Sequence, residues 1–138
     1  PLILANKDAK GDLWAASQIM SQSDLAYYSG DDPLNLALLA IGAVGVVSVT
    51  GHLVADRHRA MVEAIEANDV QTARKVNESL VPITEGIMTR AGGAIMVKAA
   101  LDLLGRTGGG SLRLPLVPAT SEQRKVLKDD LIKGGFTL

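Results

Sequence analysis

The chain has 138 residues, of which 47% are hydrophobic and 21% are charged, and its formal net charge is -1. A chain without a basic surplus gives no sign of nucleic acid or an anionic membrane as partner. The absence of cysteine excludes disulfides, thiolate metal sites and cysteine nucleophiles. The apolar runs break before the roughly 20 residues that a membrane span needs, and no signal peptide is visible, so we expect a cytoplasmic protein.

Three short apolar runs in the first half of the chain predict β-strands. They cover about residues 2–7, 26–29 and 44–49. The third run has no polar alternation, which indicates parallel strands covered on both faces. The first intervening helix follows Asp12 as its N-cap, and the second has Asp32 as N-cap with Pro33 in its first turn. This alternation favours an α/β fold.

No convincing strand follows Thr50, and the remainder predicts helices. We expect Asp56 to begin one helix and Asp69 to cap a longer one, which Pro82 should kink or split. A further helix covers about residues 95–104. The last helix begins with a capping box formed by Thr120 and Gln123, after a glycine-rich loop over 105–110 and an extended segment over 114–118.

Three parallel strands do not make a finished domain, because they leave two strand edges unpaired and a sheet face poorly covered. An open doubly wound sheet or a closed (β/α)8 barrel would complete it, and periodicity alone does not choose between them. The chain begins with Pro1, and a strand follows almost at once. We therefore expect the back part of a longer chain, and we expect that this part alone closes no barrel.

Lys7 stands where the first predicted strand ends, after apolar neighbours. It can be an ordinary solvated lysine. Its functional interpretation is a nucleophilic amine, since desolvation at a strand end favours the neutral form, and a neutral amine forms a Schiff base with a ketone. Lys10 competes for this role, but it lies past the strand beside Gly11, where we expect solvent. Strand alternation directs Asn6 toward the helices, an unusual place for an amide.

Other candidate motifs have plainer interpretations. The spacing of His52 and His58 does not favour a metal site. The three glycines over 108–110 lack the residues of a phosphate-binding loop. Tyr27 and Tyr28 are expected to be wall residues.

Three motifs, in their order along the chain, resemble the dihydrodipicolinate synthase family of pyruvate-dependent aldolases. They are Lys7-Asp8-Ala9-Lys10-Gly11-Asp12, Tyr28-Ser29-Gly30-Asp31-Asp32 and Gly45-Val46-Val47-Ser48-Val49-Thr50, and Leu112-Arg113-Leu114-Pro115 also fits. The resemblance spans essentially the whole chain. It implies the back part of a (β/α)8 TIM barrel, with strands six to eight in residues 1–68 and a C-terminal helical appendix in residues 69–138.

The resemblance implies that pyruvate forms a Schiff base on Lys7 and that the resulting enamine adds to aspartate semialdehyde, on the route to diaminopimelate and lysine. Gly30 and Val47 match positions whose backbone carbonyls line the pyruvate site. No metal or organic cofactor is implied, and family members are commonly homotetramers. The family's proton-relay residues, and the arginine that grips the semialdehyde carboxylate, are expected upstream of this chain.

The chain departs from the family pattern at Asn6, where an apolar residue is usual, and at Gly92-Gly93-Ala94, where many members have an Asn-Pro-rich turn. Two alternatives therefore stay open. The chain can belong to a sister enzyme with another aldehyde acceptor, such as an N-acetylneuraminate lyase-like aldolase. It can also be a catalytically inactive fragment.

Overall fold

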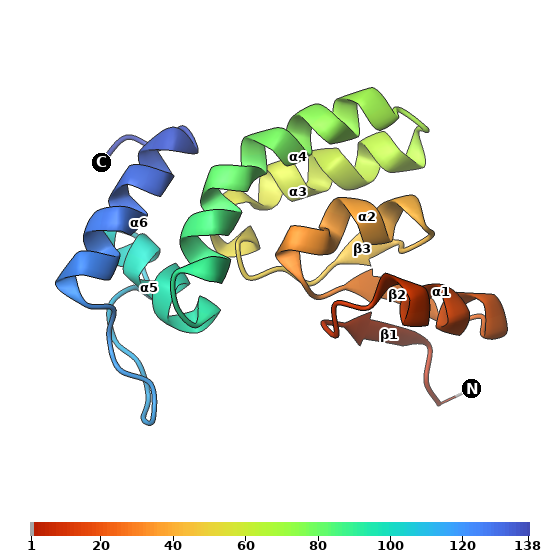
Figure 1. Ribbon diagram of the computed structural model, residues 1–138, viewed down its shortest axis with the longest axis horizontal. Helices are drawn as coiled ribbons and strands as arrows, with labels where there is room; N and C mark the ends of the chain where they lie inside the picture. Colours follow the sequence, from red (N-terminus) through yellow and green to blue (C-terminus); the bar gives the residue numbers. More distant parts are fainter. Residues whose placement is uncertain (1) are drawn as a thin grey trace.

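The computed structural model describes residues 2–138 and contains a small parallel sheet with helices beside it (Figure 1). The strands pair in the order β1-β2-β3, and both pairings are parallel. The strands are β1 (Ala5–Asp8), β2 (Ala26–Ser29) and β3 (Gly45–Val46). The helices are α1 (Leu13–Gln22), η1 (Asp32–Leu34), α2 (Asn35–Ala40), α3 (Gly51–Glu66), α4 (Val70–Thr84), η2 (Glu85–Thr89), α5 (Gly93–Leu103) and α6 (Ser121–Lys133).

The predicted α/β class and the parallel order of the strands are confirmed, but the strands are shorter than predicted. β1 begins at Ala5, because residues 2–4 are exposed to solvent. Among the described residues, their one backbone hydrogen bond with β2 runs from the Ala26 amide to the Leu4 carbonyl. β3 is reduced to two residues. Within residues 2–138, neither β1 nor β3 has a strand on its outer edge, so the expectation that this chain closes no barrel is confirmed.

Two predicted helix starts are wrong, and both errors involve Asp32. Asp31, not Asp32, takes the N-cap position of η1, and the Asp32 side chain is buried. Helix α3 begins at Gly51 rather than at Asp56. The Asp32 carboxylate accepts the two amides that precede α3, so a residue distant in sequence fixes this helix start. Asp56 lies just past a kink at Val54, which has non-helical φ and ψ angles of -134° and 39°.

The local capping predictions are confirmed. Asp12 accepts the Ala15 amide, Asp69 accepts the Thr72 amide, and the capping box of α6 is complete. Pro82 lies inside α4 without splitting it, and the helix then widens into the π-helical turn η2. No strand separates the helices from α3 onward within the described residues.

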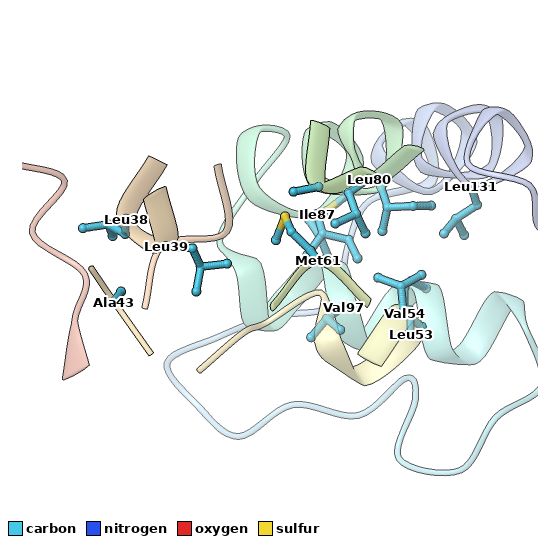
Figure 2. Packing of buried hydrophobic residues seen from close by; sticks show 14 of the residues in the cluster. Leu38, Leu39, Ala43, Leu53, Val54, Met61, Leu80, Ile87, Val97 and Leu131 are labelled. Atoms are coloured by element: carbon cyan, nitrogen blue, oxygen red, sulfur yellow. The ribbon is translucent and has the colours of Figure 1, made fainter. Parts of the chain in front are cut away.

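The hydrophobic core joins both predicted regions of the chain. Helices α3 and α4 lie side by side as an antiparallel pair (Figure 1). Figure 2 shows buried side chains from several helices gathered in one cluster, among them Met61 of α3, Leu80 of α4 and Leu131 of α6. This packing holds the C-terminal helices against the carboxyl end of β3. Across the described range 2–138, no helix is both long enough and apolar enough to cross a membrane.

Candidate active site

Lys7, Gly30 and Val47 surround one cavity of about 390 Å³ at the carboxyl ends of the strands. Lys7 pairs with Tyr28 across the sheet, and its side chain is exposed on the face opposite the half-buried Asn6 and Asp8. The other residues around the cavity are Ser48, Val49, His52, Ala94, Val97 and Lys98. The structure therefore brings the three predicted site residues together, and it adds residues from α3 and α5.

Gly30 leaves the space that the Lys7 side chain occupies. A Cβ atom added at Gly30 would lie 2.8 Å from Lys7 Cδ and 2.9 Å from Lys7 Nζ, closer than real Cβ contacts. Any larger residue would force the lysine side chain to move. The absence of a side chain at Gly30 thus leaves room for the Lys7 side chain beside the cavity.

The amides of Gly30 and Val47 are used within the sheet, whereas their carbonyls are not. The Gly30 amide donates to the Asp8 carbonyl at 2.7 Å, and the Val47 amide donates to the Ser29 carbonyl at 2.7 Å. Within residues 2–138, neither the Gly30 nor the Val47 carbonyl accepts a hydrogen bond. Two acceptors beside the lysine are therefore left for a bound molecule.

The opposite face of β1 explains the amide at position 6. Asn6 pairs with Tyr27, whose buried hydroxyl donates a hydrogen bond to the Asp8 carboxylate. Burial and the neighbouring Asp8 carboxylate raise the pKa of Tyr27 to about 12, and the nearby Asn6 side chain opposes this rise. Tyr27 is thus more than the predicted wall residue, because it ties β2 to the strand end that carries Lys7.

A buried polar network behind the cavity holds the end of β3. Asp32 accepts the amides of Val49 at 3.0 Å and Thr50 at 2.8 Å through one carboxylate oxygen, and the Asn35 side-chain amide at 3.0 Å through the other. Asn35 in turn accepts the Ser29 hydroxyl at 2.6 Å. The network therefore joins Ser29 at the end of β2 to the segment after β3, where Val49 lines the cavity.

His58 extends this network from α3. Its Nε2 lies 2.8 Å from Thr50 Oγ1 and 3.1 Å from Ser48 Oγ. Its Nδ1 is buried and has no hydrogen-bond partner among the described residues. Burial lowers the pKa of His58, against the opposing effect of the Asp32 and Asp56 carboxylates.

The lowered pKa of His58 predicts that the protein becomes less stable in mild acid. As the pH falls below about 6.5, the unfolded chain binds a proton at His58 that the folded chain resists, so the free energy of unfolding decreases. One such proton contributes a slope of at most about 1.4 kcal/mol per pH unit. Urea unfolding between pH 5 and 8 measures how the free energy of unfolding changes with pH.

The matched comparison for this prediction uses the two histidines of the chain. His58→Gln should show a shallower loss of stability with falling pH than the unsubstituted protein, whereas His52→Gln, at an exposed position, should leave the loss unchanged. Equal slopes for the unsubstituted protein and His58→Gln would show that other groups cause the acid sensitivity.

Sequence reasoning missed the contributions of His52, Ala94, Val97 and Lys98 to the cavity. These residues reach it because the core packs α5 against the end of β3, a placement that no local pattern predicts. No cluster of three or more histidine, aspartate or glutamate side chains that could hold a metal ion occurs in the described part of the chain.

The comparisons with known proteins agree with this geometry. The model of the dihydrodipicolinate synthetase family matches residues 1–133. A 4-hydroxy-tetrahydrodipicolinate synthase of Streptomyces coelicolor is 52% identical over 138 residues, which are 100% of this chain and 46% of that protein. The corresponding enzyme of Kineococcus radiotolerans is 50% identical over 134 residues, which are 97% of this chain and 44% of that protein.

A solved structure extends the likeness to the fold. The dihydrodipicolinate synthase of Acinetobacter baumannii, described as chloride inhibited and complexed with pyruvate, is 30% identical with a TM-score of 0.88. The match covers 98% of this chain and 46% of that one. The chain thus spans slightly less than half the length of these relatives. The covered share does not say which barrel strands the chain contains, so the assignment of its three strands as strands six to eight stays a prediction. The match of the family model to nearly every residue shows that the chain belongs to the dihydrodipicolinate synthetase family.

Proposed function

We propose that this chain is part of a 4-hydroxy-tetrahydrodipicolinate synthase, and that Lys7 is its Schiff-base residue. The observation that carries the proposal is the meeting of Lys7, Gly30 and Val47 around one cavity. The Streptomyces and Kineococcus relatives carry this enzyme name, and the solved structure of the Acinetobacter baumannii enzyme is described as complexed with pyruvate.

The proposed reaction begins when the neutral Lys7 amine attacks the ketone carbon of pyruvate. Loss of water gives a protonated imine, which draws electrons from the neighbouring methyl carbon, so that a proton leaves and an enamine forms. The enamine carbon bonds to the aldehyde carbon of aspartate semialdehyde, the aldehyde oxygen takes up a proton to become a hydroxyl, and the protonated imine on Lys7 forms again. The amino group of the semialdehyde then closes the ring on the former ketone carbon and releases Lys7.

The free carbonyls of Gly30 and Val47 supply acceptors beside the lysine during these steps. We assign both residues to pyruvate binding. The hydrogen bonds of Tyr27 and Asp32 hold the two flanking strand ends, so the amine and the acceptors keep one geometry. Such preorganisation is worth several powers of ten in rate for intramolecular reactions.

The remaining groups of the site belong, in this proposal, to the rest of the protein. Residues 1–68 supply three βα units of a (β/α)8 barrel and residues 69–138 a helical region, while further strands complete the sheet at the free edges of β1 and β3. We propose pyruvate and aspartate semialdehyde as the substrates, and a homotetramer as the assembly of the complete protein.

Trapping tests this proposal on the complete protein. Incubation with pyruvate and borohydride should reduce the imine to a stable secondary amine, and peptide mass spectrometry should locate the adduct on Lys7. Incubation with borohydride in the absence of pyruvate serves as the reagent control. Absence of any adduct, or an adduct located on Lys10, would contradict the assignment.

A further inference from the structure

The ionisable side chains around the cavity are all basic. They are those of Lys7, His52 and Lys98, and the remaining neighbours are glycine, alanine, valine and serine. No aspartate or glutamate among the described residues borders it. A cavity of this composition favours molecules with negative charge.

The positive charge around the cavity has no counter-charge within the described part of the chain. Among residues 2–138, no carboxylate lies within 4.0 Å of the basic groups of Lys7, His52 or Lys98. Asp102 follows Lys98 by one helical turn, where the two could pair. Its carboxylate instead accepts a hydrogen bond from Arg124 at 2.7 Å, so the charge of Lys98 stays available.

Lys98 is partly buried, and its ammonium group has one hydrogen-bond partner among the described residues. It is half-buried on α5, between the buried residues Val97 and Ala99. Its ammonium group donates one hydrogen bond to the Ser111 carbonyl at 2.7 Å. An ammonium group has three donors, which leaves two for a ligand.

We propose that Lys98 binds the carboxylate of the aldehyde substrate and thereby makes the site select anionic over uncharged aldehydes. The inference rests on the proposed function, which assigns pyruvate to Lys7 on the sheet. Lys98 lies on α5, a different element of the cavity wall from the strand that carries Lys7, so it is free to contact a second substrate beside the pyruvate adduct. A carboxylate accepts several hydrogen bonds, so Lys98 acts together with the arginine expected in the rest of the protein.

Two four-carbon aldehydes, one with a carboxylate and one without, test whether Lys98 recognises the negative charge of the substrate. Succinate semialdehyde carries a carboxylate, whereas butyraldehyde carries a methyl group in its place, and both are tested as competitive inhibitors of the complete protein. In Lys98→Met, the inhibition constant of succinate semialdehyde should rise about tenfold or more, the value expected for one lost charge-assisted hydrogen bond. That of butyraldehyde should change less than about twofold, because its methyl group accepts no hydrogen bond from Lys98.

Two further variants complete the design. Lys98→Arg keeps the charge and should keep most of the discrimination, and Lys128→Met removes a lysine from the exposed surface of α6 and should change neither constant. Equal increases for both aldehydes in Lys98→Met would reveal a structural role through Ser111, and unchanged constants would remove Lys98 from the site. Either result overturns the proposal.

Borohydride trapping with pyruvate separates this proposal from the proposed function. All four proteins should trap pyruvate equally, because Lys98 is assigned to the second substrate. Failure of trapping in the unsubstituted protein counts against the proposed function, whereas loss of trapping in Lys98→Met alone counts against the assignment of Lys98 to the aldehyde.

Discussion

The Lys7→Arg variant of the complete protein should form no pyruvate adduct and lose at least about a thousandfold of its activity. A guanidinium group stays protonated at all accessible pH values, so it keeps the charge of Lys7 but offers no lone pair to the ketone. The loss removes the covalent intermediate itself, since no other route to the enamine remains. Borohydride trapping followed by mass spectrometry measures the adduct, and steady-state assays with pyruvate and aspartate semialdehyde measure the activity.

Lys10→Ala is the matched control for this experiment. Lys10 is exposed in the loop after β1, where its ammonium group lies 3.5 Å from the Asp12 carboxylate. Its removal should leave trapping intact and alter only that exposed ion pair, which is worth at most about 1 kcal/mol. Undiminished trapping in Lys7→Arg, or lost trapping in Lys10→Ala, would place the nucleophile elsewhere.

The sequence predicted those parts of the fold that depend on neighbouring residues. Asp12, Asp69 and Thr120 each accept an amide three residues later, a contact that only the local chain must supply. The strand–helix alternation was equally readable, because each element carries its own periodicity. Lys7 could be singled out for the same reason, since its position after an apolar run is a local property.

The errors concern contacts between residues far apart in the sequence. Asp32 has the pattern of an N-cap, yet its carboxylate accepts amides 17 and 18 residues later and so helps to set the start of α3. Nothing near Asp56 reveals that this helix has already begun at Gly51. The strand lengths were overestimated because ladder pairing requires a neighbouring strand, and apolar character alone does not provide one.

The candidate site was only partly predictable for the same reason. Lys7 follows from the strand pattern, and Gly30 and Val47 follow from the family resemblance. Lys98 lies in a helix whose sequence pattern indicates only a packing role. It reaches the cavity because α5 packs beside the end of β3. The side chains that α5 contributes to the cavity therefore depend on tertiary packing and not on any sequence motif.

Asp32→Ala should destabilise the complete protein by about 3 kcal/mol or more. The substitution leaves the amides of Val49 and Thr50 and the side-chain amide of Asn35 without their acceptor, and each unsatisfied buried donor costs about 1–3 kcal/mol. The loss also frees the segment between β3 and α3 that borders the cavity. Urea unfolding measures the stability, and hydrogen exchange at the Val49 and Thr50 amides measures the local release.

The neighbouring carboxylate provides the comparison that isolates this network. Asp31 is only half-buried, and its carboxylate accepts no hydrogen bond among the described residues, so Asp31→Ala should change stability by less than about 1 kcal/mol. Asp32→Asn should lie between the two alanine variants. Its remaining oxygen can still accept the two backbone amides, but its new NH₂ group meets the NH₂ group of Asn35. If both alanine variants lost the same stability, or if exchange at Thr50 did not accelerate in Asp32→Ala, this carboxylate would not be what holds the end of β3.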